Sequence, residues 1–335
     1  MEVFHLQANT FALLCFEEDT KAIEECVKDI KNDIEEHPFK VNGNTLYLTA
    51  TLGVVLKDKG NIIQKAELAL KEARIYGKNR LSTYRDDLHI IQTIQANSIW
   101  SKRLRDAFKK NKMHAYFQPI QNIKTKQIEK YEALVRLEYE GKIYSPFEFL
   151  GAALYSGQIF EIFQFMFDAV CQKIAQTGYK FSINLSEYDL KTPTLSDYIH
   201  KTINKYNVAP NKIIFEILED TSISHQKDIQ ELINSLHHDG FSIAIDDFGT
   251  RCSNFAQLHN LAIDFIKIDG EFIKNIHQDT NAQIITKTIL NFAHAANIAV
   301  IAEFVCSQEV YDYITDLGIE FAQGYHIAAP SAKII

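Results

Sequence analysis

In the stretch Phe241-Ser242-Ile243-Ala244-Ile245-Asp246-Asp247-Phe248-Gly249-Thr250, an apolar run ends in two adjacent carboxylates. The run is apolar throughout rather than alternating, which is typical of a strand whose two faces are both covered. Neighbouring side chains in a regular strand point to opposite faces, so both carboxylates can face one site only where the strand ends and the chain turns. The segment Phe248-Gly249-Thr250 supplies that turn.

The same pattern extends outward from this stretch in both directions. From about Met113 onward, strand candidates alternate with helix candidates. The strand candidates are residues 130–136, 180–185, 212–217, 241–246, 265–268, 298–303 and 321–324, and the helix candidates lie near residues 195–206, 226–238, 253–259 and 281–296. This alternation predicts a parallel sheet, and about seven or eight such units in roughly 225 residues fit a (β/α)₈ barrel better than a doubly wound sheet. No GxGxxG motif opens a unit, which disfavours dinucleotide binding.

Composition and charge narrow the class of protein. The 335 residues include 35 Lys and Arg against 43 Asp and Glu, a formal net charge of −8, and 46% are hydrophobic. This is typical of a globular chain and argues against a disordered or collagen-like one. At ~150 residues per domain, the length suggests about two domains. The acidity argues against a nucleic-acid polymer as partner, although bound metal ions would let an acidic chain hold an anionic ligand.

The cysteines and the apolar runs bear on location. The five cysteines are scattered without a CxxC, which predicts a reduced chain with neither a disulfide framework nor a zinc cluster. No apolar run reaches the ~18 residues of a membrane span, and the start lacks the basic and apolar regions of a signal peptide. We therefore expect a cytoplasmic chain without direct membrane insertion, held at the inner face of the membrane only through a partner or missing upstream segments.

The first part of the chain has a different pattern. Strand candidates at residues 11–16 and 45–51 accompany helix candidates at residues 22–34 and 63–76, the latter with Gly77 as C-cap. These few strands make a thin sheet, which suggests that something upstream is missing. The polar stretch that follows has no Pro or Gly and predicts a connecting helix. We expect three parts: residues 1–86, a connecting helix over 87–110, and a barrel over 111–335.

A polar side chain lies at or near the carboxyl end of nearly every strand candidate. These residues are Glu132, Asn184, Glu216, Asp246 with Asp247, Lys267, Glu303 and Gln323. In a barrel all those ends converge on one face, where barrel active sites lie. So many carboxylates would repel one another without cations, and oxygen-only ligands suit Mg²⁺ or Mn²⁺ rather than zinc. Two cations ~3.5–4 Å apart clamp the attacking and leaving oxygens of a phosphoryl displacement.

Each of these residues also has an ordinary structural explanation. An Asp pair after a strand often forms a turn or a helix cap, Glu216 alone would fit a buried ion pair with a lysine, and Asn184 alone would fit a turn. The presence of one such residue at each strand end favours a site instead. In that site Lys267 is a candidate to orient the attacking water or steady developing charge. Glu303 is a candidate base or anchor.

With those residues in hand, the chain from about residue 110 to 331 resembles the EAL-domain family of cyclic di-GMP phosphodiesterases. The name-giving motif is Glu132-Ala133-Leu134 with Arg136, preceded by Phe117-Gln118-Pro119-Ile120 and followed by Ser145-Pro146 and Phe149. The further signatures follow in order: Asn184-Leu185-Ser186, Glu216-Ile217-Leu218-Glu219, Asp246-Asp247-Phe248-Gly249-Thr250, Lys267-Ile268-Asp269, Ala302-Glu303 and Gln323-Gly324-Tyr325. A lone EAL tripeptide carries no weight, but this ordered set is highly specific.

The resemblance implies an EAL-type (β/α)₈ barrel that hydrolyses cyclic di-GMP to linear pGpG with two Mg²⁺ or Mn²⁺ ions, in bacterial signalling. The metal ligands carried over by motif are Glu132, Asn184, Glu216, Asp246 and Asp247. The remaining site residues are Lys267, Glu303, Gln323 and Glu219, and the substrate contacts are Gln118 and Arg136. Glu219 matches the family glutamate that holds the loop after the Asp pair. The forked donors of an arginine suit a phosphate. A homodimer through the EAL domain is also implied.

Several positions depart from the family pattern. Arg251-Cys252 replace the usual Gly-Tyr, Phe304 replaces the glycine after Glu303, Cys306 replaces a glutamate, and Leu154 replaces an acidic residue. None of these is a metal ligand, so the departures bear on rate and dimer coupling more than on metal binding. They leave open a second function, a weak or inactive EAL-type receptor for cyclic di-GMP or a protein-interaction module. An unrelated metal-dependent barrel hydrolase or aldolase is a more distant alternative.

Residues 1–86 resemble the C-terminal part of a GGDEF (diguanylate cyclase) domain. The resemblance depends on Thr51-Leu52-Gly53-Val54, on alanines 66, 69 and 73, and on Gly77-Lys78-Asn79-Arg80. The signature position reads Gln7-Ala8-Asn9-Thr10-Phe11 in place of Gly-Gly-Asp-Glu-Phe, so both carboxylates and both glycines are lost. The front half of such a domain is absent from this sequence. We expect a degenerate remnant without cyclase activity that acts as a regulatory module.

Overall fold

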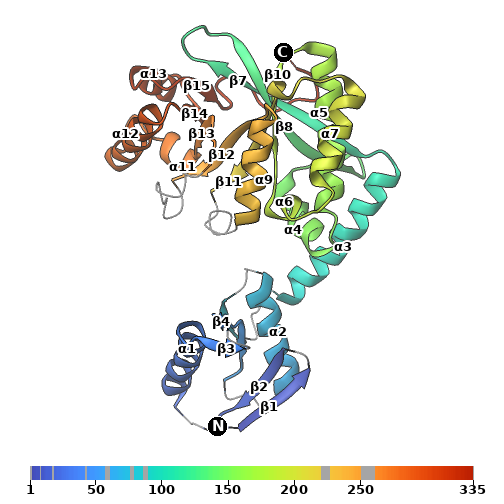
Figure 1. The fold of residues 1–335 in the computed structure, drawn as a ribbon, viewed down its shortest axis with the longest axis vertical. Helices are drawn as coiled ribbons and strands as arrows, with labels where there is room; N and C mark the ends of the chain where they lie inside the picture. The colour runs from blue at the N-terminus through green and yellow to red at the C-terminus, as the bar shows by residue number, and fades with distance from the viewer. Residues whose placement is uncertain are drawn as a thin grey trace. The chain divides into compact units, whose positions relative to one another are not determined.

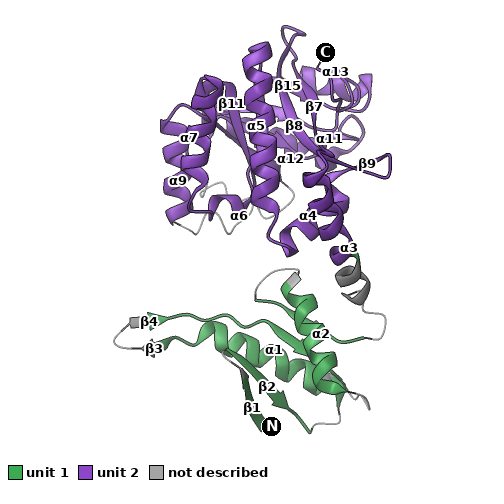
Figure 2. Cartoon of the chain, turned by 90° about the vertical axis from the view of Figure 1, so that its right-hand side faces the viewer, with its two compact units in different colours: residues 1–96 green, residues 97–335 purple. Residues whose placement is uncertain are grey.

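The chain divides into two compact units, residues 1–96 and residues 97–335 (Figure 2). The computed structural model describes residues 2–7, 9–16, 19–41, 44–56, 61–75, 79–85, 90–219, 227–249 and 261–334. Within these ranges, no helix combines the length and the apolar character needed to cross a membrane. The division after residue 96 falls inside helix α3 (Ile90–Lys109), which lies in the stretch where we expect a connecting helix.

The first unit contains short strands and two helices. These are β1 (Glu2–Gln7), β2 (Thr10–Leu14), α1 (Thr20–Glu36), β3 (Phe39–Val41), β4 (Asn44–Leu46), β5 (Leu52–Val54), α2 (Ile62–Ile75) and β6 (Leu81–Thr83). β1 and β2 form an antiparallel hairpin, as do β3 and β4, and β5 pairs in parallel with β6. Gly53 lets β5 approach α2, because a Cβ at this glycine would lie 2.3 Å from the backbone nitrogen of Leu70.

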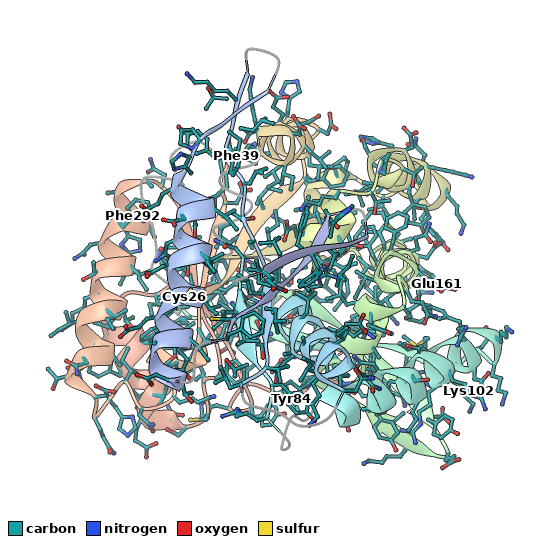
Figure 3. All side chains as sticks on the ribbon, turned by 90° about the horizontal axis from the view of Figure 1, so that it is seen from below. Cys26, Phe39, Tyr84, Lys102, Glu161 and Phe292 are labelled. Carbon is teal, nitrogen blue, oxygen red and sulfur yellow. The ribbon has the colours of Figure 1, made fainter. Side chains whose placement is uncertain are left out.

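The strand predicted over residues 45–51 is wrong beyond Leu46. β4 ends at that residue, and β5 begins only at Leu52. Tyr47 is 70% exposed, so the alternating side chains of this segment gain little burial to hold them in a sheet. Among the described residues of the first unit, the buried hydrophobic side chains are those of Ala69 and Ala73. Figure 3 labels Cys26 on α1 and Phe39 at the start of β3.

The second unit is a closed α/β barrel. Its strands are β7 (Met113–Asn122), β8 (Ile128–Tyr139), β10 (Lys180–Asn184), β11 (Ile213–Leu218), β12 (Ser242–Phe248), β13 (Phe265–Ile268), β14 (Ala299–Ala302) and β15 (Phe321–Gln323). They are hydrogen-bonded in the order β10 to β15, then β7 and β8, and a further pairing of β8 with β10 closes the ring. A short strand β9 (Lys142–Tyr144) extends β8 outside the ring.

The predicted parallel pairing holds from β10 through β15 and between β8 and β10. β7 differs, because it runs antiparallel to both β8 and β15. A tight turn joins β7 to β8, in which the Asn122 side chain accepts hydrogen bonds from the backbone of Lys124 and Thr125. A connection this short permits only antiparallel pairing, since parallel strands need a crossover segment of a dozen or more residues.

Helices cover the outside of the barrel. They are α4 (Pro146–Tyr155), α5 (Ile159–Thr177), α6 (Glu187–Leu190), α7 (Leu195–Tyr206), α9 (Lys227–His238), α11 (Gly270–Ile273), α12 (Thr280–Ala295) and α13 (Gln308–Asp316). α7, α9 and α12 confirm three of the predicted helices, and the fourth, near 253–259, lies outside the described residues. Figure 1 shows α5 and α7 side by side on one flank, and α12 and α13 near β13 to β15 on another.

The floor of the barrel interior holds a buried lysine. Lys130 is 2% exposed, and its Nζ lies 3.2 Å from the ring centroid of Phe321 and 4.0 Å from that of Phe265. Burial, together with nearby Lys180, lowers the pKa of Lys130 to about 7, against the opposing charges of Glu129 and Glu320. The ring faces stabilise the ammonium form, but a desolvated amine remains costly to keep charged.

Replacing Lys130 by methionine is expected to stabilise the fold. The folded-state pKa of about 7 lies below the unfolded value of ~10.4, so the unfolded chain binds more protons between these two values. The buried Lys130 amine therefore makes the free energy of unfolding rise between about pH 7 and about pH 10. Its destabilising effect is fully present below about pH 7. We expect Lys130→Met to increase the free energy of unfolding at neutral pH by about 2 kcal/mol and to remove the alkaline rise.

Calorimetric melting of the whole chain between about pH 6.5 and about pH 9.5 tests this expectation. Lys124→Met replaces an exposed lysine in the β7–β8 turn and serves as the matched control. Curves of melting temperature against pH that stay parallel for the native chain and Lys130→Met would contradict the assignment.

Candidate active site

Polar side chains gather at the carboxyl ends of the barrel strands. Glu132 comes from β8, Asn184 from β10, Glu216 from β11, Asp246 from β12, Lys267 from β13, Glu303 from the residue after β14, and Gln323 from β15. All except Asn184 are buried, with exposed fractions of at most 8%. The ring closes where β8 pairs with β10, and this pairing sets Glu132 beside Ser182. It therefore brings β8 next to the other strands that carry these side chains.

Lys267 is the centre of this cluster. Its ammonium Nζ is fully buried and lies among four carboxylates. The distances are 2.9 Å to Asp246 Oδ1, 2.9 Å to Glu303 Oε1, 3.1 Å to Glu216 Oε2 and 3.5 Å to Glu132 Oε2. One positive charge therefore faces four acidic groups that come from four different strands or strand ends. The excess negative charge remains for a ligand of opposite sign.

Side-chain amides border the cluster. Gln323 donates from Nε2 to Glu132 Oε2 at 2.5 Å and to Gln118 Oε1 at 3.2 Å. Asn184 donates from Nδ2 to the other oxygen of Glu132 at 3.3 Å. Gln118 donates in turn to the backbone oxygen of Ala328 at 3.3 Å. These hydrogen bonds fix the orientation of the Glu132 carboxylate, as the groups around a metal ligand usually do.

The two adjacent carboxylates reach the site by a bulge. β12 continues through Asp246 and Asp247 to Phe248, two residues beyond the predicted end of the strand at Asp246. The pairing with β13 shifts register between Ile245 and Phe248, and Asp247 adopts a left-handed φ of 54°. A bulge breaks the regular alternation of a strand, so both side chains can face the same end of the barrel.

Glu219 holds the turn after this bulge. Its carboxylate accepts a hydrogen bond from the backbone N–H of Gly249 at 2.9 Å, and its own N–H donates to the carbonyl oxygen of Asp246 at 3.1 Å. Gly249 has a φ of 102°, a conformation that favours glycine. Glu219 thus positions the backbone on both sides of Asp247 without entering the group of carboxylates around Lys267.

The donor set fits a divalent cation. One carboxylate oxygen from each of Asp246, Asp247 and Glu303 lies within 4.8 Å of the other two. The buried Oε1 of Glu216 accepts no hydrogen bond from the described residues. Carboxylate and amide oxygens of this kind are the ligands that Mg²⁺ and Mn²⁺ prefer. The structure therefore contains a buried acidic cluster suited to such an ion.

Burial and mutual repulsion shift the titration of these groups. Burial, with Asp246 and Asp269 adding to it, raises the pKa of Asp247 to about 6. Burial raises the pKa of Glu303 to about 8, although Lys267 opposes this. The pKa of Lys267 is raised well above its usual value, because the surrounding carboxylates outweigh the effect of its burial. Asp247 and Glu303, whose ionisation is disfavoured, are groups that favour the uptake of a compensating cation.

The two expected substrate contacts differ in how they are related to the cluster. Gln118 joins it through Gln323. Arg136 is not in direct contact with the carboxylates: it donates from Nη1 to the carbonyl oxygen of Val135 at 2.8 Å and lies over the Tyr116 ring. Burial lowers the pKa of Arg136, while the charges of Tyr116, Tyr325 and Glu132 oppose that change.

One residue near the site was not among the expected site residues. Asp269 interacts with the Asp247 carboxyl, and its Oδ1 accepts the N–H of Glu271 at 2.6 Å as the N-cap of α11. The Lys267-Ile268-Asp269 motif carries the signal for it, since Asp269 follows the same strand end.

Of the positions that depart from the family pattern, Arg251 and Cys252 lie outside the described residues, and Leu154 is 40% exposed on α4.

The fold and the cluster together define an α/β barrel protein with a candidate divalent-cation centre at the carboxyl ends of its strands. Within this class, residues 101–330 match the EAL domain. The chain belongs to the EAL domain family.

Relatives within the family carry names that describe an activity. The cyclic di-GMP phosphodiesterase PdeB of Shewanella oneidensis is 31% identical over 278 residues, which cover 80% of this chain and 32% of PdeB. The probable cyclic di-GMP phosphodiesterase PdeA of Escherichia coli is 35% identical over 236 residues, which cover 68% of this chain and 32% of PdeA. The matched region thus amounts to 32% of each of these longer proteins.

Solved structures share the barrel. The crystal structure of the FimX EAL domain from Pseudomonas aeruginosa bound to c-di-GMP matches with a TM-score of 0.66 and 28% identity, over 70% of this chain and 97% of that one. An EAL domain protein from Listeria monocytogenes matches with a TM-score of 0.63 and 27% identity, over 69% of this chain and 94% of that one.

The cluster is expected to bind Mn²⁺ in the absence of any other ligand. Binding to the folded state alone stabilises it by about 2.7 kcal/mol at a concentration 100-fold above the dissociation constant. We expect Mn²⁺ to raise the melting temperature of the native chain and to have little effect on Asp246→Asn, each measured against its own metal-free sample. Asp316→Asn, which changes an exposed carboxylate at the end of α13, should respond like the native chain. An equal Mn²⁺ response in Asp246→Asn would place the cation elsewhere.

Proposed function

We propose that this chain is a metal-dependent phosphodiesterase that hydrolyses cyclic di-GMP to linear pGpG. The observation that carries the proposal is the buried group of four carboxylates around Lys267, bordered by the amides of Asn184 and Gln323. The names of the relatives PdeB and PdeA support the choice of substrate. The completeness of this set supports catalysis over a receptor function without turnover.

In this proposal, two Mg²⁺ or Mn²⁺ ions are held by oxygen ligands. The ligands are Glu132, Asn184, Glu216, Asp246 and Asp247. Divalent cations bound there would neutralise charge on the phosphoryl group and favour the ionisation of water. Gln323 and Asn184 orient the Glu132 carboxylate by their hydrogen bonds, and Glu219 holds the turn that carries Asp247.

Hydrolysis opens the ring by adding one water molecule across one P–O bond. The water oxygen bonds to phosphorus, and a ribose oxygen leaves and takes up a proton. Lys267 orients the attacking water and places its ammonium beside the developing charge. Glu303, whose Oε1 lies 2.9 Å from Lys267 Nζ, accepts the proton of the water or anchors the lysine. The site is enclosed by barrel strands, which strengthens these electrostatic effects.

Substrate recognition in this proposal comes from Gln118 and Arg136. Gln118 lies beside the cluster, in hydrogen-bond contact with Gln323. Arg136 lies on the same strand as Glu132 and offers forked donors that match a phosphate.

The rest of the chain is assigned by the same proposal: a degenerate, inactive GGDEF remnant over residues 1–86 acts as a regulatory module, and residues 87–110 connect it to the barrel. The protein acts in the cytoplasm, with a homodimer through the barrel as its assembled form.

Replacing Glu132 by glutamine tests the proposal. The substitution keeps the shape of the side chain but removes one negative ligand and changes the hydrogen bonds with Gln323. We expect turnover of cyclic di-GMP with Mg²⁺ or Mn²⁺ to fall by at least about 100-fold, while the circular dichroism spectrum and the melting temperature show a folded chain. Formation of pGpG is measured by chromatography.

Glu129→Gln is the matched control, because it changes an exposed glutamate on the same strand. It should hydrolyse the substrate like the native chain. Undiminished turnover in Glu132→Gln would refute the metal assignment, and a folded native chain inactive with both ions would refute the phosphodiesterase.

A further inference from the structure

Phe304 occupies a strained position directly after Glu303. Its φ of 52° lies in the left-handed region, which costs an aromatic residue about 1–2 kcal/mol. The backbone is fixed on both sides: the N–H of Glu303 donates to the carbonyl oxygen of Ile268, and the N–H of Val305 donates to that of Gln323. The surrounding barrel therefore imposes this conformation, and a glycine would adopt it without strain.

The structure makes room for the aromatic ring. Gly270, the first residue of α11, has no side chain, and a Cβ there would lie 2.4 Å from Cδ2 and 2.8 Å from Cβ of Phe304. The ring lies over this gap, and Phe304 remains 51% exposed. Such a large apolar side chain gains little from burial here. Neither packing nor backbone preference accounts for an aromatic residue at this position.

Phe304 follows a member of the acidic cluster directly in the chain. Phe304 is the chain neighbour of Glu303, so their Cα atoms are about 3.8 Å apart. α11, against which the ring packs, also faces the turn after Asp247, because a Cβ on Gly249 would lie 2.9 Å from the Phe272 ring. The Nζ of Lys274 lies 4.4 Å from the Phe304 ring centroid. An exposed ring and an exposed ammonium therefore lie next to each other, one residue along the chain from Glu303.

We propose that Phe304 and Lys274 form a stacking site for one purine base of the substrate, a role that rests on the proposed function. A phosphodiester bound at the carboxylates carries its base one ribose away, within reach of the neighbouring residue. Stacking of a base on an aromatic side chain contributes about 1–3 kcal/mol, and Phe304 is 51% exposed. The ammonium of Lys274 is a suitable donor for the O6 and N7 acceptors of guanine.

The test measures the affinity of the whole chain for cyclic di-GMP by calorimetry in Ca²⁺, with chromatography to confirm that the ligand stays intact. The Phe304→Gly variant removes the ring and relieves the backbone strain. We expect its melting temperature to rise or stay unchanged while its affinity falls about 10-fold. Phe304→Tyr keeps a stacking surface and should bind within about 3-fold of the native chain. Phe147→Gly is the control, since it removes an exposed aromatic residue from α4.

A second variant tests the geometry. Gly270→Ala introduces the Cβ that collides with Phe304, so it should displace the ring and weaken binding in the native background. In the Phe304→Gly background the same substitution should have little further effect, and this non-additivity is the signature of a direct pair.

The outcomes separate the two proposals. If the native chain binds cyclic di-GMP and the Phe304→Gly variant binds it equally well, the stacking site is overturned and the phosphodiesterase is untouched. If the native chain itself neither binds nor hydrolyses the nucleotide, the proposed function fails. Sedimentation that shows a changed oligomeric state in Phe304→Gly, with unchanged affinity, would assign the ring to contact with a second copy instead.

Discussion

One buried ammonium among four carboxylates is the interaction on which the barrel depends. Taking Lys267 out of water costs several kcal/mol, and so does each acidic group, so the cluster is tolerable only while every member keeps its partners. Those partners come from β8, β11, β12 and the end of β14. The closure of the ring by β8 and β10 is therefore a condition for the cluster as well as for the fold. The negative charge that Lys267 leaves uncompensated is what makes the site suited to cations.

Much of this arrangement is predictable from the sequence, because barrel strands are buried on both faces and their polar residues stand out. Glu216, Lys267 and Gln323 each interrupt an apolar run near its carboxyl end, and topology then brings them together. The bulge at Asp247 is not predictable in this way, because it arises from a shift in the pairing with β13. The direction of β7 follows from the tight turn after Asn122, a local signal that the overall alternation of strands and helices hides.

The first unit shows where such reasoning stops. A strand is stabilised by the neighbours it pairs and packs with, and the segment after Leu46 exposes Tyr47 instead of burying it. An alternating pattern alone therefore does not make this segment a strand, whereas the continuous apolar runs of the barrel strands are buried on both faces. The close approach of Gly53 to Leu70 of α2 is visible only in the structure. The assignment of this unit as a GGDEF remnant consequently remains a proposal from motif.

Two lysines inside the same barrel show how completely surroundings decide the state of a side chain. Lys130 and Lys267 are both almost fully buried, yet the pKa of the first is lowered to about 7 and that of the second is raised well above its usual value. Lys130 lies against the rings of Phe265 and Phe321, whereas Lys267 lies among four carboxylates. Desolvation decides the direction of the pKa shift of Lys130, and the charge of the carboxylates decides that of Lys267. The barrel thus gathers its buried acidic groups at one end, around Lys267.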